Sequence, residues 1–282
     1  MLKVFGFVVR NPGLTHDEYR TGHIGYHNSF GRRLNNIRGY LLNVASNTPI
    51  ETSLGADLVK QITINEPTDF DTQWDGWGQL LFDAMEDYVS AKTPSVDKPG
   101  VNGLEADAMV AKVGGDFDDL YGGSPCQFHV DEHIAFPVRR PERKIFKLAQ
   151  FGRRAPDLAP ELFRAYLTSR YGTLAATIPG LRGLVVNFRT ELDVMSEFFA
   201  ADAEGFTPNG IQRREKFYDG FDVIIEYWFD SPAQYVAARN NPDYEDLNRL
   251  ESRLFDRLFC REVDETVAVM PKRDSPAPFY HR

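Results

Sequence analysis

The sequence has few cysteines, no long hydrophobic run and no excess of positive charge. Its 282 residues include only Cys126 and Cys260, and so few thiols favour reduced side chains over a disulfide framework. No apolar segment is long enough to cross a membrane, and residues 1–4 enter a strand pattern rather than a secretion signal. The net charge of −9 argues against nucleic acids and anionic membranes as partners. We therefore expect a cytoplasmic protein that binds neither.

Motifs for the common cofactors are also missing. The glycines between residues 103 and 123 do not form a phosphate-binding loop followed by a helix and a lysine. There is no G-x-S-x-G nucleophile motif either. We therefore expect no organic cofactor. A haem stays open at this point, because a histidine of the fold could serve as its axial ligand.

What the sequence does contain is a long internal repeat. Residues 2–43 align with residues 146–187 without a gap, and many aligned residues are identical. A repeat of this length is too long for a solenoid unit. We therefore divide the chain into two similar domains, residues 1–139 and residues 140–282, which cover each other's apolar faces. Identical residues at one constant offset include the pairs Leu14/Leu158, Arg20/Arg164, Gly39/Gly183 and Asn43/Asn187.

Each repeat has the pattern strand, helix, strand, strand, helix, strand. In the first repeat Thr15 and Glu18 have the spacing of a capping box at the start of the first helix. The order predicts an α+β fold with two ferredoxin-like βαββαβ units. Because both helices cover one face of each antiparallel sheet, the two bare faces are expected to pack together as an intrachain α/β barrel. The first repeat is longer within residues 92–128, which could form either a lid or a solvated loop.

Several segments resemble the EthD-domain family. Residues 14–20 followed by His27, residues 37–43 and residues 74–83 carry the resemblance in the first repeat, and residues 229–231 and 241–244 carry it in the second. The family belongs to the dimeric α/β-barrel superfamily, which includes cofactor-free cyclases, lyases, decarboxylases and monooxygenases, haem enzymes, and proteins without known activity. The resemblance therefore implies this fold and a small, often aromatic, substrate.

The same resemblance places the active pocket in the first repeat. His27 stands on the family's usual histidine, and His23 stands where the family has a tryptophan. The second repeat has Leu167 and Tyr171 at these two positions, so it is expected to be mainly scaffold.

His23 and His27 are four residues apart on one predicted helix, so their side chains should be neighbours. An imidazole that titrates near neutral pH suits acid–base catalysis, and we interpret His27 as the main catalytic residue. The same pair could bind a metal, but no third ligand is evident, and no metal site is predicted. A purely structural pair of histidines is the remaining alternative.

Other side chains are candidates for the same cavity. Asp75 could orient a histidine, and His133 lies on a strand where the second repeat has Thr266. Trp74 and Trp77 could stack on a flat ligand. Glu226 aligns with Gln79, which suggests a polar cavity floor. Tyr26 could contact the substrate, and the tyrosines of the second repeat that could line the cavity and donate hydrogen bonds are Tyr166, Tyr171, Tyr218 and Tyr227. For each of these residues, ordinary packing in the core or on the surface is the alternative.

These observations predict a cofactor-independent enzyme, of the lyase, cyclase or isomerase type, that acts on a small aromatic or oxygenated cyclic compound. Proton transfer by His27 would drive elimination, cyclisation or bond cleavage. The alternatives are a small-molecule binding protein that accompanies a pathway, and a cofactor-free monooxygenase. The chain could also form a homodimer of its two-repeat unit.

Overall fold

The computed structural model describes residues 1–70, 74–91, 119–123, 125–141 and 143–271. Most of the longer segment of the first repeat, within residues 92–128, lies outside the described residues. Cys126 and Cys260 are buried and free, as expected. No helix within the described ranges is long and apolar enough to cross a membrane.

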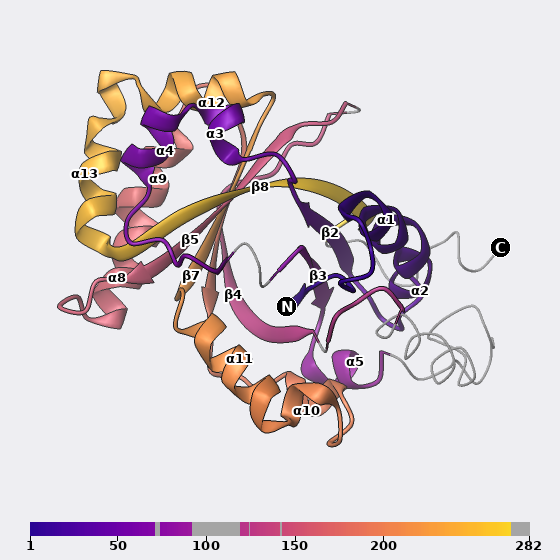
Figure 1. The fold of residues 1–282 in the computed structure, drawn as a ribbon. Coiled ribbons are helices and arrows are strands. Elements are labelled where there is room, and N and C mark those ends of the chain that lie inside the picture. Colours follow the sequence, from indigo (N-terminus) through magenta and orange to yellow (C-terminus); the bar gives the residue numbers. More distant parts are fainter. Residues whose placement is uncertain (71–73, 92–118, 124, 142, 272–282) are drawn as a thin grey trace.

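Eight antiparallel strands form a closed barrel (Figure 1). Hydrogen bonds connect them in the order β1-β3-β2-β8-β5-β7-β6-β4, and β4 closes the ring on β1. The first four strands thus have the order β4-β1-β3-β2, and the last four repeat it as β8-β5-β7-β6. The strands are β1 (Leu2–Val8), β2 (Gly39–Ala45), β3 (Gly76–Phe82), β4 (Cys126–Phe136), β5 (Phe146–Arg154), β6 (Leu181–Arg189), β7 (Val223–Phe229) and β8 (Phe255–Val269).

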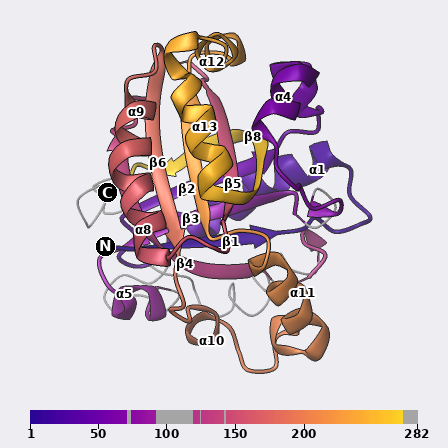
Figure 2. The same cartoon turned by 90° about the vertical axis from the view of Figure 1, so that its left-hand side faces the viewer.

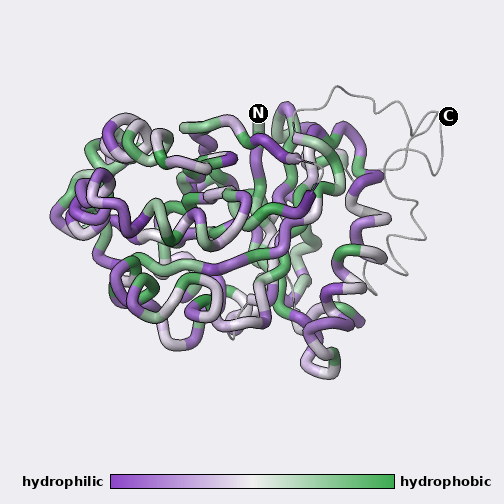
Figure 3. The backbone as a smooth tube through the Cα atoms, turned by 90° about the horizontal axis from the view of Figure 1, so that it is seen from above, coloured by the Kyte–Doolittle hydropathy of each residue, from purple (hydrophilic) through white to green (hydrophobic). Residues whose placement is uncertain are grey.

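Short helices surround the barrel and carry both hydrophilic and hydrophobic stretches (Figure 3), as expected for elements with one face on a sheet and one face in water. In residues 1–139 they are α1 (His16–Thr21), η1 (Gly22–His27), α2 (Asn28–Gly31), α3 (Ile50–Leu54), α4 (Ala56–Ile62) and α5 (Met85–Val89). In residues 140–282 they are α8 (Pro160–Tyr166), η4 (Leu167–Tyr171), α9 (Gly172–Ala176), α10 (Met195–Phe198), η5 (Glu204–Phe206), α11 (Pro208–Tyr218), α12 (Pro232–Arg239), η6 (Pro242–Tyr244) and α13 (Glu245–Leu254).

The first helix begins as the sequence predicts. The Thr15 hydroxyl accepts a hydrogen bond from the backbone of Glu18, and the Glu18 carboxylate accepts one from the backbone of Thr15 at 2.8 Å. This capping box satisfies two backbone donors that a helix start would otherwise leave unpaired. Its effect on function is positional, because it fixes where α1 starts and therefore where the histidines of η1 lie.

The strands separate an inner core from an outer one, because successive side chains of a strand point to opposite faces. In β1, Phe5 and Phe7 point into the barrel and join an aromatic cluster with Phe151 and Phe259 of the opposite half. Leu2, Val4 and Val8 of the same strand point outward under the helices. The barrel therefore joins the two halves through a shared core.

The outer core differs between the two halves. The helices α8, α9, α12 and α13 cover the same side of the barrel (Figure 2). The buried side chains beneath them form one continuous cluster. Under α1 and α2 the described residues form two separate clusters, one around Tyr40 and Phe82 and one around Tyr19 and Val44. The outer core of the N-terminal half is thus divided.

Candidate functional site

The histidines of η1 lie where the N-terminal core is divided. His23 is buried, and its Nδ1 atom lies 2.8 Å from the Tyr121 hydroxyl. The His23 ring stacks on Tyr19 at 5.3 Å between ring centroids and on His27 at 5.5 Å, with only 7° between the two imidazole planes. The predicted neighbourhood of His23 and His27 is therefore confirmed. The nearby Tyr121 was not predicted, because it follows a segment without a helix or strand pattern.

Burial controls the protonation of His23. It lowers the pKa of the imidazole well below 6.5, and the neighbouring charge of His27 lowers it further. His23 is therefore neutral at pH 7. A neutral imidazole has one donor and one acceptor nitrogen. Tyr121 occupies Nδ1, and the buried Nε2 has no hydrogen-bond partner among the residues that the structure describes.

The sheet beneath this helix lacks two side chains. Gly6 of β1 lies opposite Gly78 of β3, and both point to the helix side. A Cβ atom added at Gly78 would have only the Tyr40 ring within 4 Å, at 3.3 Å, and one added at Gly6 would first meet Gln127 at 3.4 Å. The glycine pair therefore removes side-chain volume from the middle of this face.

The helix that carries the histidines contacts the same face of the sheet at two points. At the start of the helix the Tyr19 hydroxyl lies 2.8 Å from a Cβ atom placed at Gly76. At the end, Gly31 packs against the Tyr40 ring, which also lies over Gly78. His23 and His27 lie between these two contacts along the helix. We call His23, His27, Tyr121, Gly6 and Gly78 the histidine site.

The same places are filled in the C-terminal half. Leu167 and Tyr171 replace the histidines, and Gln150 lies opposite Ile225 where the N-terminal half has two glycines. The Tyr171 hydroxyl, a predicted substrate contact, bonds to Gln150 at 3.2 Å, to Glu251 at 2.9 Å and to the Tyr227 hydroxyl. All of these groups are buried. Tyr171 therefore lies in a packed polar core.

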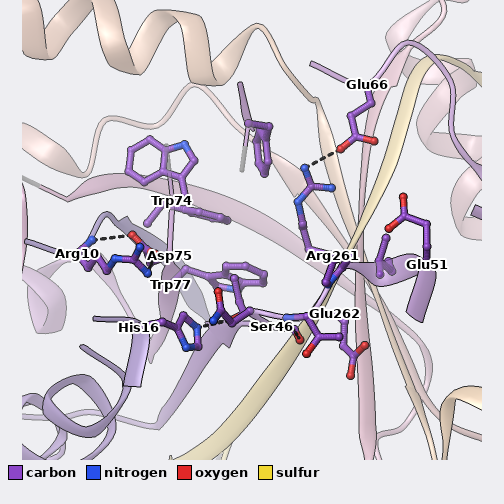
Figure 4. A pocket seen from close by; sticks show the side chains of 17 residues that line it. Arg10, His16, Ser46, Glu51, Glu66, Trp74, Asp75, Trp77, Arg261 and Glu262 are labelled. Carbon is purple, nitrogen blue, oxygen red and sulfur yellow. Dashed lines mark hydrogen bonds and ion pairs between the residues drawn. The ribbon is translucent and has the colours of Figure 1, made fainter. Parts of the chain in front are cut away.

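A second site opens at one mouth of the barrel (Figure 4). This barrel-mouth pocket has a volume of about 370 Å³ and brings together three predicted residues, Trp74, Asp75 and Trp77. Asp75 accepts a hydrogen bond from the backbone of Arg10 at 2.8 Å and pairs with its guanidinium at 3.1 Å. The rest of the lining consists of Phe7, His16, Ala45, Ser46, Asn47, Thr48, Pro49, Ile50, Glu51, Glu66, Phe70, Arg261 and Glu262.

The pocket and the histidine site lie on opposite faces of the same sheet. Trp77 points into the barrel, whereas its neighbours Gly76 and Gly78 point to the helices. The structure therefore does not bring the tryptophans to the histidine pair. Sequence reasoning missed His16, whose Nε2 atom lies 2.8 Å from the Ala45 carbonyl oxygen. Its place directly after the helix cap Thr15, next to a strand end, was the available signal.

The other end of the barrel holds an ionic network around Glu226. The Glu226 carboxylate accepts hydrogen bonds from Lys147 at 2.6 Å, from Gln79 at 2.5 Å and from Asn187 at 3.0 Å. Lys3 lies 3.7 Å away. Burial alone would raise the pKa of Glu226, but the charges of Lys147 and Lys3 outweigh it and lower the pKa to about 2. The predicted polar residues of the two halves thus meet, but as a packed network.

The remaining predicted residues are dispersed. Tyr26 and Tyr166 are exposed, and Tyr218 donates a hydrogen bond to the Gln127 carbonyl oxygen at 2.9 Å. His133 lines a shallow depression of β4 together with Glu132. Among the residues that the structure describes, no group of three His, Cys, Asp or Glu side chains could hold a metal ion.

Comparisons with known proteins agree with this architecture. The model of the EthD domain matches residues 155–257, which confirms the resemblance for that part of the chain. No curated protein matches the chain. Among solved structures, a candidate monooxygenase from Fusobacterium nucleatum has a TM-score of 0.55 at 9% identity, with 96% of this chain and 94% of that chain covered. An anthrone oxidase-like protein has a TM-score of 0.51 at 10% identity, with 98% and 96% covered. At these identities the similarity concerns the fold alone, a closed eight-stranded barrel with surrounding helices.

Proposed function

We propose, for a chain whose residues 155–257 match the EthD domain, that it is an enzyme that moves a proton on a small aromatic or oxygenated cyclic compound. The observation that carries the proposal is that the helix with the stacked pair His23–His27 packs on the sheet face that contains the glycine pair Gly6–Gly78. The equivalent positions of the other half hold only packed side chains. Loss of side-chain volume beside titratable groups, in one half only, is the pattern expected of an active site.

The two histidines have different roles in this proposal. His27 accepts a proton from a C–H or O–H group adjacent to a carbonyl. His23 stays neutral and is positioned by Tyr121. When the Tyr121 hydroxyl donates to Nδ1, the Nε2 atom of His23 carries the hydrogen, so this contact selects one tautomer of the ring that stacks on His27.

The fate of the resulting carbanion decides the reaction class. Elimination or cyclisation gives a lyase or cyclase. Reaction with dioxygen gives a cofactor-free monooxygenase, which oxidises a ring CH₂ group to a carbonyl and releases one water for each O₂ consumed. Anthrone is a suitable first compound, because one of the similar structures is an anthrone oxidase-like protein. Anthraquinone formation with matching oxygen uptake would support the oxidative branch.

We also propose that the chain consists of two ferredoxin-like domains, residues 1–139 and 140–282, fused into one barrel. The repeated strand order β4-β1-β3-β2 and β8-β5-β7-β6 supports this division. The π-helical segments at equivalent places, Gly22–His27 and Leu167–Tyr171, support it as well. In this scheme the N-terminal domain carries the chemistry and the C-terminal domain completes the barrel. The free buried thiols support a cytoplasmic location.

The proposal is tested with two variants of the histidine site. His27→Ala should lower kcat about 100-fold or more, as expected when general acid–base catalysis is lost. Gly78→Ile restores the side chain of the other half and should abolish binding of anthrone while the protein stays folded. His129→Gln is the control, because His129 lies on β4 and its ring bonds to Thr190, outside the histidine site. The activity of this variant should stay within about twofold of wild type. Unchanged turnover in His27→Ala would remove His27 from the mechanism. Wild-type binding without turnover would indicate a binding protein.

A further inference from the structure

The glycine pair of the histidine site belongs to a row of four residues across the sheet. The row runs through Gln127 of β4, Gly6 of β1, Gly78 of β3 and Leu42 of β2. Residues that pair directly across strands share one face, so Gln127 points to the helix side as the glycines do. A Cβ atom placed at Gly6 would lie 3.4 Å from the Nε2 atom of Gln127. The amide of Gln127 therefore lies beside the place that a side chain at Gly6 would occupy.

The hydrogen bonds of Gln127 are complete except at the amide nitrogen. The residue is only 7% exposed, and its Oε1 atom accepts a hydrogen bond from the Tyr88 hydroxyl. Its backbone nitrogen bonds to the Met195 sulfur at 3.1 Å, and its carbonyl oxygen accepts from Tyr218. The Nε2 atom makes no hydrogen bond to the part of the chain that the structure describes. Because buried polar groups are nearly always paired, these N–H groups point to an absent acceptor.

The C-terminal half contains a glutamine amide with a complete set of partners. The equivalent row consists of Cys260, Gln150, Ile225 and Val186. The amide of Gln150 accepts from the Tyr171 hydroxyl at 3.2 Å and donates from its Nε2 atom to Glu251 at 3.1 Å. In both halves a tyrosine therefore binds the amide oxygen. Only the C-terminal half supplies an acceptor for the amide nitrogen.

We propose that Gln127 binds the carbonyl oxygen of the substrate at the histidine site. The Nε2 atom of Gln127 donates a hydrogen bond to this oxygen, and Tyr88 holds the amide in the required orientation through Oε1. The ligand thus supplies the acceptor that Glu251 supplies to Gln150 in the other half. The inference rests on the proposed function for the position of the ligand, which lies against the glycine pair.

This contact narrows the substrate class to cyclic ketones with an acidic C–H group. When His27 takes the proton, the electron pair of the C–H bond forms a C=C bond, and the negative charge moves to the oxygen. A hydrogen bond to a charged oxygen is stronger than one to a neutral carbonyl. Gln127 therefore stabilises the enolate more than the ketone, which lowers the barrier to proton transfer.

The test compares anthrone with 9,10-dihydroanthracene, which has the same three rings without the carbonyl. Binding is measured by titration calorimetry under nitrogen with His27→Ala, so that no turnover occurs. This variant should bind anthrone about fivefold more tightly than dihydroanthracene, as expected for one neutral hydrogen bond. Addition of Gln127→Met should weaken binding of anthrone about fivefold and leave that of dihydroanthracene nearly unchanged. In the presence of His27, Gln127→Met should lower kcat about tenfold or more.

The outcomes separate this inference from the proposed function. Gln127→Leu serves the same purpose if Gln127→Met does not fold. If the substitution weakens both compounds equally, or neither, Gln127 only fills space beside Gly6 and the inference is overturned. A loss of turnover in His27→Ala would then still support the proposed function. If wild type turns over no anthrone but Gln127→Met removes the preference for the carbonyl compound, the proposed function is wrong and the contact is confirmed.

Discussion

Glu226 shows how much one side chain contributes to the polar end of the barrel. It is fully buried and accepts hydrogen bonds from both halves, from Gln79 of the first and from Lys147 and Asn187 of the second. The sequence placed Glu226 and Gln79 at equivalent positions of the repeat, and the structure brings them into contact. What the sequence could not show was that lysines from both halves would fill the space around them.

Replacement of Glu226 by glutamine should lower the free energy of unfolding by about 1–3 kcal/mol, because Lys147 and Lys3 lose the buried carboxylate that they share. Each lysine keeps a second carboxylate, Glu265 for Lys147 and Glu132 for Lys3. Urea denaturation measures the difference. Glu132→Gln is the matched control, since this carboxylate binds only Lys3 and is partly exposed, and its loss should be smaller. Equal losses in both variants would contradict a central role of Glu226.

The same residue predicts acid sensitivity. Its folded pKa of about 2 lies below the ordinary value of 4.5, so its contribution is complete above pH 4.5 and is lost as the pH falls toward 2. Wild type should therefore lose more stability between pH 5 and pH 3 than Glu226→Gln does.

The residue scale also shows a limit of sequence reasoning. Trp77 and His27 were expected in one cavity. A period of two residues shows that Trp77 and Gly78 point to opposite faces, but it does not show which face the helix covers. In the structure Trp77 points into the barrel interior, whereas His27 lies on the helix side of the sheet.

At the scale of elements, the residue at which the first helix begins was predicted correctly, but the geometry of its later turns was not. Thr15 and Glu18 identified the N-terminus, because a capping box depends on local residues alone. The π-helical turn of Gly22–His27 was not predicted, because widened turns depend on packing against the sheet. The i, i+4 relation of the histidines was nevertheless kept.

Two glycines of this helix should respond oppositely to alanine. A Cβ atom at Gly25 would have nothing within 4 Å, so Gly25→Ala should stabilise the protein by about 0.5–1 kcal/mol through lower chain entropy in the unfolded state. A Cβ atom at Gly31 would overlap the buried Tyr40 ring, so Gly31→Ala should be destabilising. Thermal unfolding of both variants gives the comparison. Stabilisation by both substitutions would show that the helix does not press on Tyr40.

At the scale of the whole molecule, a segment of each half packs into the outer core of the other half. Leu54, Leu58 and Ile62 of α3 and α4 pack into the outer core of the C-terminal half. In return, Val194 packs into the outer core of the N-terminal half, and the ring of Phe198 in α10 stacks on Tyr88 at 4.7 Å. This exchange could not be predicted, because residues 46–75 have no regular hydrophobic period. The barrel itself was predictable from the repeated strand order.

This exchange predicts that neither half folds alone. Residues 1–139 and residues 140–282, expressed separately, should lack cooperative unfolding, because each would expose its inner sheet face and its exchanged helices. Mixed, they should form a one-to-one complex with the circular dichroism of the intact chain. Size-exclusion chromatography and thermal unfolding measure both results. A single half that unfolds cooperatively as a monomer would contradict the interdependence.

Closure of the barrel restricts how copies of this protein can associate. Every strand from β1 to β8 has a hydrogen-bonded neighbour on each side. The barrel therefore has no edge strand, and among these strands backbone groups that pair on one side only lie in overhanging ends, such as β4 beyond Val130 and β8 beyond Val263. A homodimer would therefore use helix surfaces, the rims of the barrel or these strand ends, because no complete strand edge is open to a second copy.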